Sequence, residues 1–335
     1  MFSIYVDDFA IVSSNKDCID ELCHILKAKY IITETEDLET FLGVRIEQED
    51  GHMYLSQPGH IEKLAHAADI DLTRQDTEVV KSPMRPDFKD TYQNEAPLGN
   101  KPLYQTLLGM LIFVLKTRPD IAYAVNRLAT RSIAPTTRDM DAILRVIKYL
   151  VHTADIELVY ANADSQARNK VGELFAYTDA AYLTHRDSKS HSGVCFSYGK
   201  NTGMFYSRSS KQSVVATSST EAELFTGVEC TKEVLHFRDL LRELNFSLLT
   251  PTVIYTDSKS MITLATKFSG HTRKVKHFLM RLNFLIEHVQ QQDITFEYIA
   301  SEDLTADVLT KPLVGAAFER HRDSLMGAQR KKTKY

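Results

Sequence analysis

The alternation of hydrophobic and polar positions divides the chain into segments with different periods. Two short β-rich runs, 2–6 and 9–12, flank Asp7 and Asp8, which predicts a hairpin with two carboxylates at its tip. Adjacent like charges repel, so this pair is either an ordinary acidic turn or a place where a metal relieves the repulsion. Segment 17–30 has the apolar spacing of an amphipathic helix.

A second hairpin follows this helix. Segment 40–46 is predicted to be one strand, the Asp50-Gly51 pair a turn, and 53–57 the returning strand. Residues 60–69 are predicted to form a short helix.

The middle of the chain begins without periodicity and then becomes helical. Segment 77–102 is rich in Pro, Asp, Asn and Lys, which is typical of a linker. The apolar segments 103–131 and 137–152 are predicted to be buried helices, with a break at Pro119.

The last third alternates between strand and helix periods. A strand at 173–179, a hairpin at 192–208 and a long helix at 219–243 are expected first. A strand at 252–257, two helices within 258–290, a strand at 294–299 and a helix that holds Asp307 complete the pattern. This order predicts an α/β domain built on one mixed sheet.

Carboxylates stand where these predicted elements begin or end. Asp179 and Asp257 close strands, Asp307 lies at a helix, and both Glu221 and Glu223 follow the start of the long helix. Ser218 with Glu221 and Thr220 with Glu223 both fit a capping box, so one of the two glutamates is explained as a cap. Such an ordered set suits a two-metal phosphodiester hydrolase, because Mg²⁺ binds hard oxygen ligands and must keep sites open for water and phosphate.

Composition narrows the class of protein. The 335 residues carry a net charge of -4, yet segments 196–220 and 258–286 contain no Asp or Glu and several basic residues. These strips are either phosphate-tracking surfaces or solvated faces. The four cysteines lack zinc-ligand spacing, and no apolar run approaches about 18 residues. The first residues are interrupted by two acids and lack a basic n-region, so we do not expect them to act as a signal peptide. We therefore expect an intracellular protein, cytoplasmic or nuclear, with reduced cysteines and no membrane span.

Several motifs, in one order, resemble a known family. Tyr5-Val-Asp-Asp8 resembles the Y-x-D-D motif of reverse transcriptases, and the second hairpin looks like their primer grip. The stretches Y-x-x-L-L-G from Tyr104, Y-T-D-A, S-S-T-E-A-E, Y-T-D-S-K-S and A-D-V-L-T-K-P-L are similar to the C-terminal part of copia-type LTR retrotransposon Pol polyproteins. The β-β-β-α-β-α-α-β-α order is that of ribonuclease H.

The resemblance implies the following division. Residues 1–95 would be the C-terminal part of a reverse-transcriptase palm and thumb, 96–170 a connection region, 171–313 a ribonuclease H domain, and 314–335 a basic tail. The fold class expected is therefore α/β (α+β), a truncated palm and thumb followed by a ribonuclease H-like mixed sheet.

The resemblance also implies the site. The metal ligands and catalytic residues would be Asp179, Glu223, Asp257 and Asp307, holding two Mg²⁺ or Mn²⁺ ions that cleave the RNA strand of an RNA–DNA hybrid. Glu223 is preferred to Glu221 because it precedes Leu224, as in the family, and shares a helical stripe of small and apolar residues. Many ribonucleases H carry a histidine shortly before the last aspartate, and none stands there in this chain. Expected hybrid contacts are Lys211, Gln212, Arg273, Lys274, Lys276 and His277.

The polymerase half departs from the family. Tyr5, Asp7 and Asp8 are a remnant of the polymerase motif, because elongation also needs an earlier palm aspartate and fingers, which belong upstream of that motif. Polymerase activity is expected only if another Pol-derived chain supplies these parts. The alternative to a nuclease is a non-catalytic remnant that binds nucleic acid or a partner. A DDE integrase is disfavoured, because it carries no glutamate on the first helix.

Overall fold

The computed structural model describes residues 2–13, 15–33, 38–71, 79–88, 96–161, 173–199, 202–246, 248–267, 276–327 and 329. Its fold is mixed α/β, as predicted, with three separate sheets. Among the described residues, no helix is both long and apolar enough to cross a membrane.

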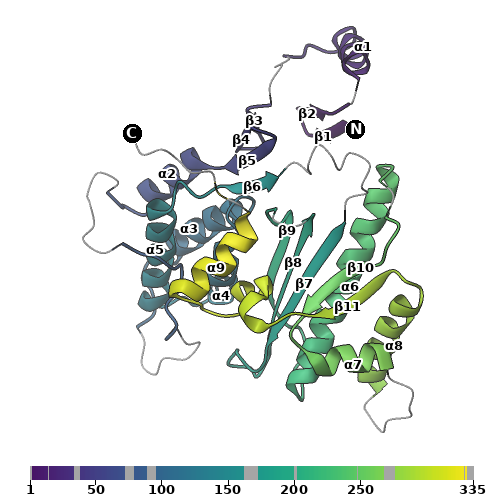
Figure 1. Ribbon diagram of the computed structural model, residues 1–335. Coiled ribbons are helices and arrows are strands. Elements are labelled where there is room, and N and C mark those ends of the chain that lie inside the picture. Colours follow the sequence, from purple (N-terminus) through teal and green to yellow (C-terminus); the bar gives the residue numbers. More distant parts are fainter. Residues whose placement is uncertain are drawn as a thin grey trace.

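The N-terminal part is a small two-stranded sheet with one helix. Strands β1 (Phe2–Tyr5) and β2 (Asp8–Ile11) pair antiparallel, and α1 (Lys16–Lys27) follows after Asn15, whose side chain accepts a hydrogen bond from the Asp17 amide. Figure 1 shows these elements at the top, beside the rest of the molecule. The predicted hairpin and helix are therefore present.

A four-stranded sheet comes next, in the order β3-β4-β5-β6. Its strands are β3 (Thr40–Phe41), β4 (Val44–Glu49), β5 (His52–Ser56) and β6 (Leu158–Ala161). The prediction of one strand over 40–46 was wrong. The chain turns at Leu42 and Gly43, with φ of +50° and +76°, and glycine adopts this left-handed backbone without steric cost. Strand β6 completes this sheet from a position far along the chain.

The connection helices form one apolar core. They are α2 (Pro58–Ala67), α3 (Lys101–Val114), η1 (Pro119–Ile121), α4 (Ala122–Ala129) and α5 (Thr137–His152). Leu107, Leu111, Ile143 and Ile147 are fully buried between them. The break predicted at Pro119 is present, because a short 3₁₀ turn separates α3 from α4 there.

The chain after residue 313 differs from the predicted basic tail. Residues Gly315–Met326 form helix α9, which buries Phe318, Leu325 and Met326. The Phe318 ring packs edge-on against Tyr149 of α5, with centroids 5.7 Å apart. The segment 330–335 of that predicted tail lies outside the described residues.

The five-stranded sheet has the order β11-β10-β7-β8-β9. Its strands are β7 (Leu174–Ala181), β8 (His191–Tyr198), β9 (Tyr206–Lys211), β10 (Thr252–Thr256) and β11 (Ile294–Tyr298). Strands β7, β8 and β9 are antiparallel, whereas β10 runs parallel to both β7 and β11. This is the ribonuclease H-like arrangement that the sequence predicted.

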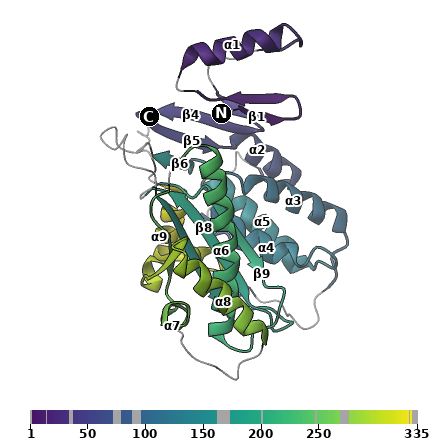
Figure 2. The same cartoon turned by 90° about the vertical axis from the view of Figure 1, so that its right-hand side faces the viewer.

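Helices cover both faces of this sheet. On one side lie α6 (Ser219–Glu243), α7 (Lys259–Lys267) and α8 (Lys276–Gln290); α4 and α9 lie on the other (Figures 1 and 2). The short turns η3 (Ser301–Asp303) and η4 (Thr305–Leu309) follow β11. Buried residues of η4, α4, α5 and α9 share one hydrophobic core, so the sheet and the connection helices are packed together.

Candidate metal centre

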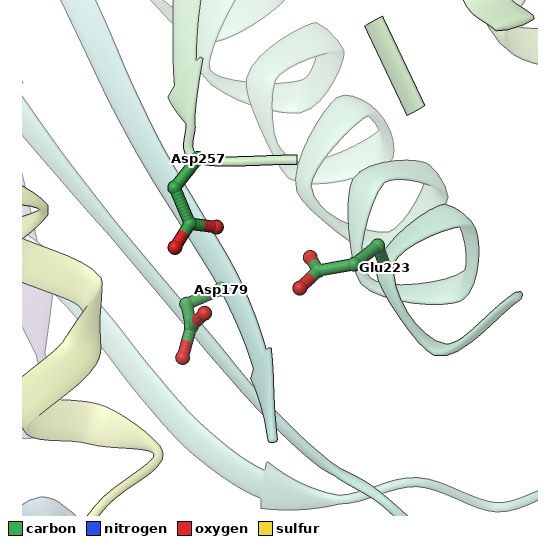
Figure 3. A group of neighbouring side chains, drawn as sticks. All are labelled: Asp179, Glu223 and Asp257. Carbon is green, nitrogen blue, oxygen red and sulfur yellow. The ribbon is translucent and has the colours of Figure 1, made fainter. Parts of the chain in front are cut away.

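Three carboxylates meet where the central strands end. Asp179 lies near the end of β7, Asp257 directly follows β10, and Glu223 lies in the second turn of α6. Because β7 and β10 are parallel neighbours, their carboxyl ends reach the same edge of the sheet. One oxygen atom from each of the three side chains lies within 4.8 Å of the others, and Figure 3 shows the three groups converging.

Glu223 has the environment that most favours a bound cation. Its side chain is 8% exposed, and its Oε2 atom has no hydrogen-bond partner within the described residues. Burial, together with the charges of Asp179 and Asp257, raises the pKa of Glu223 well above its usual value. An unpaired buried carboxylate is costly, and a divalent cation removes that cost.

Glu221, the other glutamate of this turn, has a different task. Its Oε2 atom accepts hydrogen bonds from the amide and hydroxyl of Thr217, at 2.8 and 2.7 Å. Its amide donates to the Ser218 side chain at 3.2 Å, so Glu221 belongs to the N-terminal cap of α6. The structure places Glu223, and not Glu221, among the converging carboxylates.

Asp307 lies beside this group, next to a lysine. The Lys311 Nζ atom is 2.8 Å from Asp307 Oδ1 and 3.5 Å from Asp179 Oδ2. Burial and the charge of Asp179 raise the pKa of Asp307 to about 7, although Lys311 acts against the rise. Lys311 therefore supplies the positive charge between two of the four predicted acids.

Side chains around the acids hold them in place. The Thr310 hydroxyl donates to Asp179, and the Ser301 hydroxyl donates to Asp257 Oδ2 at 2.5 Å. Ser301, Thr310 and Lys311 were not expected at the site from the sequence. Lys311 carried a signal, since it follows Asp307 by four residues, the spacing at which helical side chains meet.

A histidine also approaches the site, from α9 rather than from the loop before Asp307. His321 is 4% exposed, and Lys311 and Asp179 are among the charged groups that influence its protonation. Burial and the positive charges of Arg320 and Lys311 lower the pKa of His321, so its ring is neutral near pH 7. The sequence analysis had no reason to place this helix at the site.

The predicted hybrid contacts are not equivalent. Lys211 ends β9 and pairs with Asp187 at 2.9 Å, while Lys276 and His277 are exposed at the start of α8. Arg273 and Lys274 lie outside the described residues. Gln212 departs from the expectation, because it is 2% exposed and its Nε2 donates to Ser192 Oγ and the Ala222 carbonyl at 3.0 Å. This side chain fastens α6 to β8.

The polymerase-motif residues lie away from this centre. Tyr5 ends β1, Asp7 lies in the turn, and Asp8 begins β2. All three are exposed. Among the described residues, the cluster of three carboxylates consists of Asp179, Glu223 and Asp257 and does not include them.

Comparison with known proteins agrees with this architecture. Residues 1–86 match the family of reverse transcriptases (RNA-dependent DNA polymerases). Among curated proteins, the Pol polyproteins of transposons RE1 and RE2 of Arabidopsis thaliana are 28% and 30% identical over 94% of this chain. The chain spans 21% of the length of either relative.

A solved structure shows a similar fold. The foamy viral protease–reverse transcriptase in complex with double-stranded DNA matches this chain with a TM-score of 0.50 and 14% sequence identity. The match covers 90% of this chain and 46% of the viral one. The similarity of fold therefore extends over most of this chain.

Proposed function

We infer from the relationship of this chain to the Pol polyproteins of copia-type LTR retrotransposons that it carries a metal-dependent ribonuclease H. Its substrate is the RNA strand of an RNA–DNA hybrid. The observation that supports this most is the meeting of Asp179, Glu223 and Asp257 within 4.8 Å at the end of the central strands.

The residues present fit a divalent metal. Carboxylate oxygens are the ligands that Mg²⁺ and Mn²⁺ prefer, and the unpartnered, buried Oε2 of Glu223 is a ligand atom in need of a cation. Asp179, Glu223 and Asp257 would hold one ion, and Asp307 would help Asp179 to hold a second. Bound divalent ions activate the attacking water and stabilise the leaving 3′ oxygen of a phosphodiester.

The surrounding residues position these ligands. Thr310 and Ser301 fix one oxygen each of Asp179 and Asp257, and the other oxygen of each carboxylate would be available to a cation. Lys311 holds Asp307 beside Asp179 and reduces the repulsion between the two carboxylates. When the ligand side chains are already held in place, little free energy is spent on ordering them as the metal and the substrate bind.

We place the surface that binds the RNA–DNA hybrid on the side of the five-stranded sheet that carries α8. Lys276 and His277 lie exposed there, with positive or neutral side chains able to contact phosphates. Discrimination in favour of RNA would come from 2′-hydroxyls read across the minor groove. Tyr5, Asp7 and Asp8 belong to a polymerase motif that we propose works only with palm and finger segments from further Pol sequence.

The test is cleavage of a labelled RNA–DNA hybrid by the full chain with Mg²⁺ or Mn²⁺. We expect RNA-strand cleavage that Asp179→Asn abolishes and that Glu221→Gln leaves intact. A folded wild-type chain that cleaves the hybrid in neither metal contradicts the nuclease and favours the non-catalytic alternative.

A further inference from the structure

A buried chain of polar side chains runs from the connection helices to the turn that carries Asp307. It begins at Arg127 of α4, passes through His185 and His191, and reaches Ser209 of β9. The Ser209 hydroxyl donates to the carbonyl of Leu309, the last residue of η4, at 2.6 Å. All four side chains are at most 8% exposed.

The direction of every hydrogen bond in this chain is consistent. Arginine carries only donors, so a ring nitrogen of His185 accepts from Arg127 Nη1, which lies 2.8 Å from Nδ1 and 3.1 Å from Nε2; we assign the shorter contact, to Nδ1, as the hydrogen bond. His185 Nε2 then donates to His191 Nδ1 at 2.9 Å, and His191 Nε2 donates to Ser209 Oγ at 2.7 Å. With both rings neutral, each link has one donor and one acceptor, and Ser209 is left with its proton for Leu309.

Helix α4 holds the chain at two points one turn apart. Arg127 contacts His185, and Tyr123 packs edge-on against the His191 ring with centroids 5.2 Å apart. Both histidines are thereby fixed by one helix of the connection region. Buried hydrogen bonds in series strengthen one another, so a shift at one end of this chain is transmitted to the other.

The far end of the chain lies among the metal-site residues. Leu309 stands between Asp307, whose carboxylate meets Lys311, and Thr310, whose hydroxyl donates to Asp179. On its other side, η4 rests on β8, where a Cβ at Gly193 would lie 2.9 Å from the Ala306 carbonyl oxygen. The backbone of η4 is therefore clamped from two strands.

We propose that the Arg127–His185–His191–Ser209 chain positions η4, so that the connection region sets where Asp307 lies relative to Asp179. Ser209 is the positioning residue in contact with η4, and Arg127 acts through the two histidines. This inference rests on the proposed function, because it assigns Asp307 a part in binding metal.

The experiment is a double-mutant cycle on the full chain with Mn²⁺ binding as the readout. Ser209→Ala is expected to weaken Mn²⁺ binding about 10-fold, as loss of groups that orient metal ligands does. Ser207→Ala, on the same strand, is the matched control and is expected to bind as the wild type does. In an Asp307→Asn background, Ser209→Ala is expected to cause no further loss.

The outcomes separate the inference from the function. If Ser209→Ala binds Mn²⁺ as tightly as the wild type, or weakens binding equally with Asp307→Asn present, the positioning role is wrong while the metal site stands. If the wild type itself binds no Mn²⁺, both proposals fail.

The role of the connection region needs its own variant. Arg127→Met is expected to weaken Mn²⁺ binding in the same direction as Ser209→Ala, and unchanged binding would overturn the link to α4. Should Arg127→Met not fold, His191→Phe keeps a ring of similar size and breaks the same chain, with the same two outcomes.

Discussion

At the scale of single residues, the two glutamates of the first turns of α6 have the same carboxylate but differ in burial and in hydrogen-bond partners. Glu223 is buried against two other acids, whereas the Glu221 carboxylate is bonded to Thr217. Charge on Glu223 therefore destabilises the metal-free protein, and charge on Glu221 does not meet that repulsion. The same substitution at these two positions should have opposite consequences.

We expect Glu223→Gln to raise the melting temperature of the metal-free chain by about 2 °C or more, because it removes a buried, repelled charge. The same variant should lose hybrid cleavage by about 100-fold or more, since a ligand is gone. Glu221→Gln should keep cleavage and lose a little stability through its cap. Thermal melts and cleavage rates of both variants check this, and equal effects at the two positions would contradict it.

The acid cluster also predicts how stability depends on pH. Burial and Asp179 raise the pKa of Asp307 from 3.8 to about 7, so the folded chain binds a proton that the unfolded chain has released. Between those values the folded state binds more protons, and its stability therefore falls as pH rises. Above about pH 7 the penalty is complete, and divalent cations should remove it.

Thermal melts of the metal-free chain at pH 5 and pH 8 test this against Asp307→Asn, which cannot titrate. The wild type should lose more stability than the variant on going to pH 8, and should regain it when Mn²⁺ is added. A parallel fall in the two proteins would show that Asp307 is not the group responsible.

At the scale of elements, the site depends on how closely η4 lies on β8. Gly193 is the register partner of Asp179, and a Cβ there would come within 2.7 Å of Thr310 Cγ2 and 2.9 Å of the Ala306 carbonyl oxygen. Backbone cannot yield as a flexible side chain does, so Gly193→Ala must displace η4. Gly109, whose added Cβ would meet nothing within 4 Å, offers a control on an unrelated helix.

We expect Gly193→Ala to weaken Mn²⁺ binding about 10-fold and to lower stability by about 1–3 kcal/mol, the usual cost of overpacking. Gly109→Ala should be neutral or slightly stabilising, because alanine is the better helix former. Calorimetric metal titration and denaturant unfolding of both variants measure the two effects. Wild-type metal affinity in Gly193→Ala would show that η4 does not need this contact.

Elements with a clear period could be predicted from the sequence, and contacts between distant elements could not. The bounds of α6 and the succession of strands and helices along the C-terminal part followed from apolar spacing and turn residues, whereas their arrangement in one sheet was implied only by the resemblance to ribonuclease H. The turn at Leu42 and Gly43 was missed because β-branched and aromatic residues stand on both sides of it, and a single glycine inside such a run is compatible with one strand. Gln212 was read as a surface contact, since nothing local reveals that its amide is buried against α6.

At the scale of the whole molecule, the ribonuclease H-like sheet packs against parts of the chain that lie outside its own sequence motifs. Helix α9 and the connection helices cover one face of this sheet. Apolar residues in and just before η4 share a core with residues of α3, α5 and α9, namely Leu304, Ala306 and Leu309 with Leu111, Val146 and Phe318. Strand β6, which follows α5, pairs with β5 and so joins the connection helices to the four-stranded sheet. The unit expected over residues 171–313 therefore shares its hydrophobic core with helices on both sides of it in the sequence.

We accordingly expect a fragment of residues 171–313 to be far less stable than one of residues 96–327, although both contain all four acids. The shorter fragment exposes apolar surface that α4, α5 and α9 cover, and each fully buried large side chain contributes about 1.5–3 kcal/mol. It also lacks Arg127, so its Mn²⁺ affinity should fall even where it folds. Denaturant unfolding and Mn²⁺ titration of the two fragments decide this. Equal stability and equal metal affinity would mean that the C-terminal sheet is an independent domain and that the connection region only tethers it.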